Sequence, residues 1–445
     1  MNSNKDILNE VLSKQTNVLN IKEDDKYKNL GLKFNPFPRS GTTNINSSDF
    51  YNQQLFPVDK KVKDQIVDFI SHSLNDNYID PEDKFISATI TGDYGSGKTQ
   101  LLMFVKYLLG EISSVQGKKN PYVIYIDNPG VNLLELVGAI ISKIGEENFK
   151  KFIWSKIISG IRANRNLRDK LAKFENKSVS LFQDINPDPY SDENTISYKK
   201  FLDSFIRYIN TPKQRKEFEN TFKEVLLDIL EPEVGNSILA HYFYQLISED
   251  YGVNKTWEAL SSGSIRQLDK KETEIIKYIV RLIKEQGYSD FFILVDEFED
   301  ITEGRLSKPQ VDNYVYNLRT LLDEHREWCL LFAMTGQALK KLRSVSPPLA
   351  DRISSRLIVL QDFNNEEAKN IIINYLNIAR DDKNSELILF DDSGINKLNE
   401  IVEGNARNFL KYSYFLVEKA AVSFNATDKI NSEFVSSQYP KDIIR

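Results

Sequence analysis

The sequence predicts an α/β protein built on a five-stranded parallel sheet. Five short apolar runs alternate with segments whose apolar residues recur at helical spacing. Several of the runs are apolar almost throughout, which is typical of parallel strands covered by helices on both faces. The runs expected to form strands are 85–91, 121–128, 291–295, 329–334 and 357–360.

The segments between these runs predict the remaining organisation. Helical patterns cover about 58–73, 101–109, 132–144 and 404–421, and two more, 218–230 and 238–246, fall within a long connection that is broken at Asn186-Pro187-Asp188-Pro189. This connection is much longer than the few helices that a minimal core of this kind needs, so it is expected to be mostly an insertion. The expected domains are an N-terminal extension (1–57), a core (58–144 and 286–361), a helical insertion (145–285) and a C-terminal helical lid (362–445).

Composition excludes several classes of protein. The chain has 445 residues and one cysteine, Cys329, so it cannot form an intrachain disulfide, and its three histidines do not provide a zinc pattern. The net charge of −6 argues against an extensive nucleic-acid-binding surface but allows a local basic patch. No run approaches the ~18 apolar residues of a membrane span, and the polar N-terminus does not resemble a signal peptide. We therefore expect a cytoplasmic protein without a membrane partner.

A glycine-rich segment between the first strand and its helix predicts nucleotide binding. It fits the pattern G-x-x-x-x-G-K-[ST] at every fixed position. Backbone N–H groups of such a loop, together with the start of the helix, bind phosphates. Lys98 is expected to reach the β- and γ-phosphates of ATP, and the Thr99 hydroxyl to bind Mg²⁺. The expected cofactor-binding residues here are Gly92, Asp93, Tyr94, Gly95, Ser96, Gly97, Lys98, Thr99 and Gln100.

Acidic residues follow the third expected strand. Asp296 and Glu297 come directly after an apolar run, in the pattern of a Walker B motif. Asp296 is expected to bind Mg²⁺ together with Thr99, and Glu297 to orient or deprotonate the attacking water. Glu299 and Asp300 follow closely, so the assignment among the four acidic residues stays open.

Further candidates lie at the ends of later elements. Thr335 follows the fourth strand and is a candidate to contact the γ-phosphate or the water, with Gln337 as the competing choice and a capping turn as the structural alternative. Arg352 and Arg356 precede the fifth strand, where either is a surface residue or an arginine finger for a neighbouring subunit. Arg407, near a helix start, is a candidate sensor of the γ-phosphate.

Together these features resemble an AAA+ ATPase, a P-loop NTPase, over about residues 30–145 and 286–421. Four segments are similar to the branch that holds origin-recognition initiators, ExeA-type secretion ATPases and transposition regulators: Asn35-Pro36-Phe37, Tyr125-Ile126-Asp127-Asn128-Pro129, Thr335-Gly336-Gln337-Ala338-Leu339 and Gly404-Asn405-Ala406-Arg407. The resemblance implies ATP hydrolysis and a homo-oligomer. Asn128 matches a position that holds the Walker B glutamate inactive in many AAA+ proteins. The glycine-rich segment is also similar to ATPases of BREX-type phage-defence systems.

Two functions follow from this resemblance. In the first, ATP hydrolysis switches an oligomer that acts on double-stranded DNA or on a DNA-bound partner. In the second, an ATP-dependent signalling or scaffold module of a phage-defence system recruits a separate effector protein. The insertion holds a basic stretch that is either a phosphate-contacting surface or a solvated helix face whose aromatic residues, Phe149, Phe152 and Trp154, belong to the core. Its basic residues are Lys150, Lys151, Lys156, Arg162, Arg165, Arg168, Lys170, Lys173 and Lys177.

Overall fold

The computed structural model of the protein forms two compact units. The loop–lid unit comprises residues 1–68, 90–107 and 358–445, and the sheet–insertion unit comprises residues 69–89 and 108–357. Within these ranges the structure describes residues 26–41, 59–74, 86–112, 120–174, 209–235, 237–248, 271–301, 308–324, 328–380, 389–425 and 427–438. Most of the expected N-terminal extension and the expected break at 186–189 lie outside the described residues.

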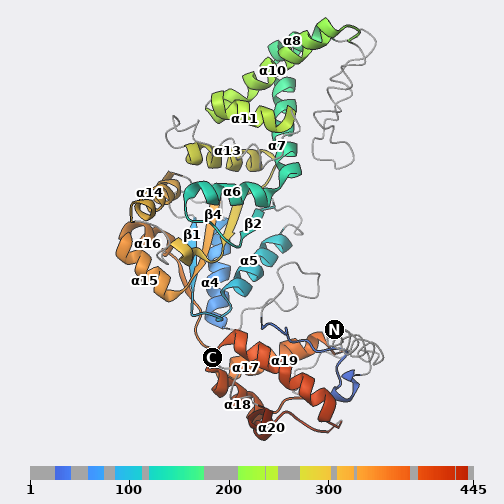
Figure 1. Cartoon of the computed structure of the whole chain (residues 1–445), viewed down its shortest axis with the longest axis vertical. Helices are drawn as coiled ribbons and strands as arrows, with labels where there is room; N and C mark the ends of the chain where they lie inside the picture. Colours follow the sequence, from blue (N-terminus) through green and yellow to red (C-terminus); the bar gives the residue numbers. More distant parts are fainter. Residues whose placement is uncertain are drawn as a thin grey trace, which may run out of the picture. The chain divides into compact units, whose positions relative to one another are not determined.

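The five expected strands form one sheet (Figure 1). Their order is β2-β3-β4-β1-β5, and β3 pairs in parallel with both β2 and β4, with Ile293 opposite Ile124 and Leu330. All residues of β1, β3 and β4 are buried, which explains the continuous apolar sequences of β3 and β4. The α/β prediction is confirmed. The strands are β1 (Ser87–Thr91), β2 (Tyr122–Ile126), β3 (Phe291–Val295), β4 (Trp328–Met334) and β5 (Leu357–Val359).

Helices of the sheet–insertion unit pack on β2 and β3. Helix α6 (Leu133–Ile144) packs on β2 and begins at Asn132, whose side-chain oxygen accepts the N–H of Glu135. Helix α13 (Lys271–Glu285) packs on β3 and on α6. The remaining elements beside the sheet are η5 (Phe298–Ile301), α14 (Lys308–Glu324), α15 (Gly336–Val345) and α16 (Pro347–Ile353).

The described part of the insertion is helical, and in Figure 1 its helix α7 (Glu146–Ala163) leads away from the sheet. Helix α10 (Pro212–Val234) packs on α7, α8 (Arg165–Ala172), α11 (Ser237–Ser248) and α13. One hydrophobic cluster continues from the sheet into these helices and contains Phe149, Phe152 and Trp154. The aromatic residues of the basic stretch are therefore core residues.

The loop–lid unit has its own hydrophobic core. The lid helices are α17 (Asn365–Ile378), α18 (Asp392–Val402), α19 (Ala406–Ser423) and α20 (Ser432–Gln438). Helices α4 (Lys60–Ser73) and α5 (Lys98–Ile112) start in this unit. No described helix is both long and apolar enough to span a membrane.

The segment 26–41, which contains η1 (Lys28–Leu30), packs on the lid. Phe37 is buried and stacks on Tyr375 with ring centroids 5.3 Å apart. The Asn35 side chain donates to the carbonyl oxygen of Tyr414 at 3.0 Å and to the Glu418 carboxylate at 2.9 Å. The Asn35-Pro36-Phe37 segment thus anchors the start of the described chain to the lid.

Glu418 gathers the hydrogen bonds of this anchor. It accepts from Lys26, Tyr27 and Asn35. Burial raises the pKa of the Glu418 carboxyl, but the hydrogen bonds from Asn35, Lys26 and Tyr27 outweigh this, so the pKa lies below its ordinary value of 4.5. Because the folded-state pKa is lowered, the stabilisation is complete well above pH 4.5 and is lost as the pH falls from there through the lowered pKa.

We predict that Glu418→Gln lowers the free energy of unfolding by about 1.5 kcal/mol or more at pH 7, because hydrogen bonds to a charged group are replaced by weaker ones. The difference from the wild type, measured by urea unfolding, should shrink as the pH is lowered below about 4.5. Glu433→Gln, on the exposed face of α20, is the matched control and should change little. A difference that does not depend on pH would contradict this role for the charge.

Candidate nucleotide site

The glycine-rich segment forms a loop between β1 and α5, which we call the phosphate loop (92–99). Gly95 and Gly97 have φ angles of +82° and +97°, which side-chain-bearing residues rarely adopt. Helix α5 begins at Lys98, within this segment. The first N–H groups of the helix therefore lie at the end of the phosphate loop. Thr99 and Gln100 belong to the first turn of α5. The expected setting of strand, glycine loop and helix is present.

Protein donors bind four carbonyl oxygens of the phosphate loop. Lys98 Nζ donates to the carbonyl oxygens of Gly92 and Asp93, each at 3.0 Å. Asn405 Nδ2 donates to the carbonyl oxygen of Tyr94 at 2.8 Å, and the backbone N–H of Arg407 donates to that of Gly95 at 3.0 Å. The loop is therefore held both by its own lysine and by two donors from the start of α19.

The start of lid helix α19 therefore contacts the phosphate loop. Asn405 also caps α19, because its side-chain oxygen accepts the N–H of Asn408 at 3.1 Å. A Cβ atom on Gly95 would lie 2.8 Å from Asn405 Oδ1, so only glycine fits here without displacement. The guanidinium of Arg407 lies over the ring of Tyr94, 4.6 Å from its centroid. The structure thus brings the predicted residue Arg407 to the loop.

A cavity of about 300 Å³ opens beside the phosphate loop within the loop–lid unit. The size is at the low end of ligand pockets. Its wall combines apolar side chains of α17 and α19 with polar groups of the segment after β5. Apart from Ser96, Gly97 and Gln100, the residues that line it were not predicted from the sequence as a site. The lining residues are Asp59, Val62, Ser96, Gly97, Gln100, Leu101, Leu360, Gln361, Asp362, Phe363, Asn364, Glu367, Ile371, Tyr375, Ala406 and Leu410.

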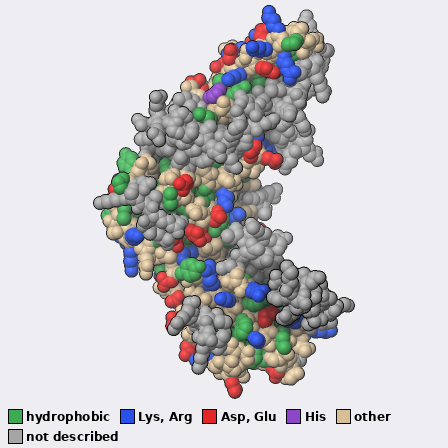
Figure 2. All heavy atoms as spheres, in the orientation of Figure 1, with side chains coloured by type: hydrophobic (Ala, Val, Ile, Leu, Met, Phe, Trp, Pro, Cys, Tyr) green, Lys and Arg blue, Asp and Glu red, His purple; other side chains and the backbone are tan. Residues whose placement is uncertain are grey.

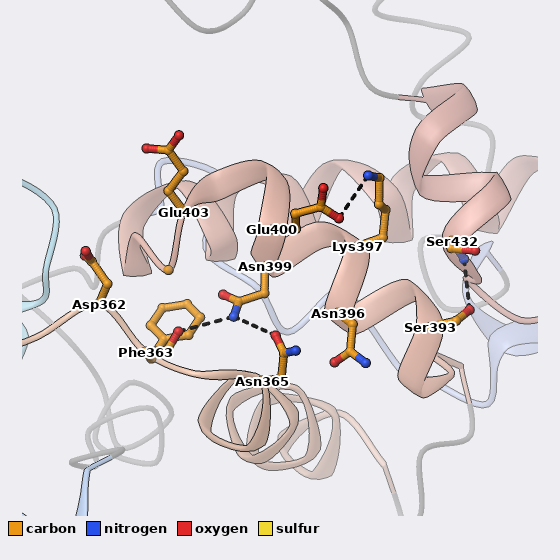
Figure 3. A pocket seen from close by; sticks show the side chains of 11 residues that line it. Asp362, Phe363, Asn365, Ser393, Asn396, Lys397, Asn399, Glu400, Glu403 and Ser432 are labelled. Atoms are coloured by element: carbon orange, nitrogen blue, oxygen red, sulfur yellow. Dashed lines mark hydrogen bonds and ion pairs between the residues drawn. The ribbon is translucent and has the colours of Figure 1, made fainter.

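The lid fixes the segment after β5 from its other side, where a second hollow lies (Figure 3). Asn399 Nδ2 donates to the carbonyl oxygen of Phe363 at 3.2 Å and to Asn365 Oδ1 at 2.9 Å. The N–H of Phe363 donates to the carbonyl oxygen of Gly404 at 3.2 Å. This hydrogen bond joins the cavity wall to the start of α19, where Asn405 and Arg407 lie.

In the sheet–insertion unit, Asp296 is held by neighbouring groups. It is 5% exposed, and its Oδ2 accepts the hydroxyl of Tyr125 at 2.9 Å while its Oδ1 accepts the N–H of Glu297 at 3.0 Å. Burial, followed by the charge of Asp296, raises the pKa of Tyr125. Tyr125 lies on β2, which pairs with β3, and Asp296 is the residue that follows β3. A tyrosine within an otherwise apolar strand run was the available signal for this role.

Glu297 has an unusual backbone conformation. Its φ angle is +51°, in the left-handed region that residues other than glycine seldom adopt. Such a conformation costs on the order of 1–3 kcal/mol. The surrounding structure must therefore hold Glu297 in place, and side chains held in this way occur often in active sites.

The side chains of Asn128 and Thr335 each accept a hydrogen bond from a backbone N–H nearby in the sequence. Asn128 Oδ1 accepts the N–H of Gly130 at 2.8 Å. Thr335 is the N-cap of α15, where its hydroxyl accepts the N–H of Ala338 at 3.2 Å. The capping turn considered for Thr335 is present, and Gln337 is exposed in the first turn of the same helix. Both side chains thus have structural roles in this state.

The two arginines before β5 are exposed. Arg352 lies in α16, and its carbonyl oxygen accepts the Ser87 hydroxyl at 2.8 Å. The carbonyl oxygen of Arg356, the residue before β5, accepts the N–H of Thr89 on β1 at 2.9 Å. Backbone bonds therefore fix both positions at this edge of the sheet, while both side chains remain accessible.

Comparison by sequence finds no matching family model and no similar curated protein. Comparison by structure finds similarity to two proteins of Aeropyrum pernix. One is ORC2, solved as ADPNP and ADP complexes (TM-score 0.43, 13% identity, 86% of this chain and 68% of that chain covered). The other is ORC1, solved in complex with DNA (TM-score 0.41, 13% identity, 87% and 66% covered). The chain spans about two thirds of the length of each. Both are similarities of structure at low sequence identity.

We predict that Tyr125→Phe lowers the free energy of unfolding by about 1–3 kcal/mol, because a buried carboxylate loses a hydrogen-bond donor. Chemical denaturation at pH 7 is the measurement. Tyr122→Phe is the matched control on the same strand: the Tyr122 ring packs against Phe152, Tyr288 and Phe291, and this packing survives the change. Equal effects of the two variants would contradict the proposed support of Asp296.

Proposed function

We propose that the protein is an ATPase that binds ATP with Mg²⁺ at the phosphate loop. The observation that carries this proposal is the contact between the loop and the lid. Asn405 and Arg407 bind the carbonyl oxygens of Tyr94 and Gly95 beside a cavity of about 300 Å³. The loop would hold the phosphates, and the apolar residues of α17 and α19 would hold the base. Lys98 would exchange its two carbonyl partners for phosphate oxygens when ATP binds.

The residues for Mg²⁺ offer the right chemistry. Thr99 and Asp296 provide a hydroxyl and a carboxylate, and Mg²⁺ bound with nucleotide phosphates needs few protein oxygens besides these. Among the described residues, no cluster of three or more His, Cys, Asp and Glu side chains could hold a metal ion by itself. The ion would neutralise charge on the phosphates during the transfer. Tyr125 fixes Asp296 for this role.

Glu297 would orient the attacking water and accept its proton. Each candidate residue comes directly after a strand of the same sheet, in which β4 lies between β3 and β1. The phosphate loop follows β1, Asp296 and Glu297 follow β3, and Thr335 follows β4. Thr335 would reach the water or the γ-phosphate only after its capping hydrogen bond to Ala338 is given up.

We predict that Lys98→Ala abolishes ATP binding, because the phosphates lose their cation, and that Glu297→Gln preserves binding while stopping hydrolysis. Equilibrium binding of labelled ATP and phosphate release measure the two effects. Lys106→Ala, exposed on the same helix α5, is the matched control and should leave both unchanged.

Two results would count against the site. Wild-type ATP affinity in Lys98→Ala would show that the nucleotide binds elsewhere. Hydrolysis by Glu297→Gln at the wild-type rate would move the catalytic role to another acidic residue, of which Glu299 is the nearest candidate.

We further propose that hydrolysis switches a homo-oligomer that acts on DNA or on a DNA-bound partner. Arg352 and Arg356 are both candidates for the finger that reaches the γ-phosphate of a neighbouring subunit. Their side chains are exposed, and hydrogen bonds hold the backbone of each, which suits that role. Which of the two acts as the finger stays open.

A second candidate function, recruitment of a separate effector protein, is favoured by the charges of the insertion. Its basic side chains are largely paired with carboxylates of the same unit. Figure 2 shows Lys and Arg side chains mixed with Asp and Glu around α8. The paired carboxylates compete with phosphates for these cations, and the buried aromatic residues cannot stack on bases. The pairs are Lys150–Glu146, Lys156–Glu233, Lys156–Glu285, Arg165–Asp169, Lys170–Asp228 and Lys173–Glu217.

We predict that reversing the exposed Arg165 and Arg168 to Glu leaves DNA affinity and its salt dependence unchanged. The measurement is DNA binding by the full chain at several salt concentrations, with Lys340→Glu and Lys341→Glu on α15 as the matched control. A DNA-contacting insertion would instead lose about 0.9 from the log–log salt slope for each phosphate contact removed. If the salt slope falls only in the variant with Arg165 and Arg168 reversed, the insertion contacts DNA, and the proposal that its charges favour an effector protein is wrong.

A further inference from the structure

Arg407 is held from several sides within the loop–lid unit. Its guanidinium carbon lies 4.6 Å from the centroid of the Tyr94 ring, and its backbone N–H is bound to Gly95. Gly41, with φ +69°, packs on its other side, where an added Cβ would lie 2.3 Å from the Arg407 carbonyl oxygen and 3.0 Å from its Cγ. The backbone and the stem of the arginine are thus fixed, and only the Tyr94 ring orients the charged end among these contacts.

Tyr94 has no evident packing role. It occupies a position of the phosphate loop at which the sequence pattern accepts any residue, and its side chain is 75% exposed. A large aromatic ring so exposed gains little from burial. The cation–π contact with Arg407 accounts for the position of the ring.

We propose that Tyr94 is a positioning residue that holds the Arg407 guanidinium at the phosphate loop, ready for the γ-phosphate, and so makes the site prefer a nucleoside triphosphate to a diphosphate. This rests on the proposed ATP site. A free arginine side chain populates many rotamers, so fixing it before the ligand arrives lowers the entropic cost of binding. Contact with a ring also leaves the outer N–H groups of the guanidinium available to phosphate oxygens.

The contact is local to the triphosphate end of the ligand. The base cavity is lined by Ala406 and Leu410 of α19 but not by Tyr94 or Arg407. Loss of the ring should therefore weaken the binding of ATP and leave that of ADP unchanged. A role in shaping the loop would instead weaken both nucleotides together, because the loop would also hold the phosphates of ADP.

The test is the dissociation constant of the full chain for ATP and for ADP, each with Mg²⁺. We expect Tyr94→Leu to weaken ATP binding by about two- to fivefold, the range of an exposed cation–π contact, with ADP binding unchanged. Tyr94→Phe keeps the ring and should retain wild-type values. Tyr316→Leu, an exposed tyrosine on α14, is the matched control and should change neither constant.

A double-variant cycle then tests whether Tyr94 acts through Arg407. In an Arg407→Met background, Tyr94→Leu should cause no further loss of ATP affinity. Equal losses for ATP and ADP, an unchanged ATP constant in Tyr94→Leu, or additive losses in the double variant would each overturn the proposal. Failure of the ATP site itself is distinguished by Lys98→Ala, which would then bind ATP as well as the wild type does.

Discussion

The join between the phosphate loop and the start of α19 is the interaction on which the candidate site depends. Asn405 does two things at once: its oxygen caps α19, and its nitrogen binds the carbonyl oxygen of Tyr94. A movement of α19 would therefore also move the phosphate loop. The Phe363–Gly404 hydrogen bond extends the same connection to the wall of the base cavity. A ligand that occupies both the loop and the cavity would meet one continuous set of hydrogen bonds.

The beginning of the described chain reinforces this join. Phe37 stacks on Tyr375, which lines the cavity, and Gly41 packs against Arg407. Glu418 gathers Lys26, Tyr27 and Asn35 on α19. The Asn35-Pro36-Phe37 segment thus has a physical reason for its residue types: an amide to bridge two acceptors, a rigid turn, and a ring to fill the lid core.

Much of the fold was predictable because its signals are local. The apolar run 291–295 is a buried parallel strand, and Gly97, the second fixed glycine of the pattern, has a positive φ angle. The base cavity was not predictable, because its residues come from α4, α5, the segment after β5, α17 and α19, and no local pattern links them. The support of Asp296 by Tyr125 depends in the same way on the neighbouring positions of β2 and β3. The basic stretch was ambiguous because its pairing carboxylates lie mainly on other helices, such as Asp228 on α10.

Hydrogen–deuterium exchange of the full chain, with and without ATP and Mg²⁺, tests the central claim most directly. Backbone amides in segments joined by the loop–lid contacts should be protected together when the nucleotide binds. The account predicts slower exchange in 92–100, 360–364 and 403–410, with no such change for ATP added to Lys98→Ala. Protection confined to other segments, or absent from 403–410 while 92–100 is protected, would contradict a nucleotide site shared by the phosphate loop and the lid.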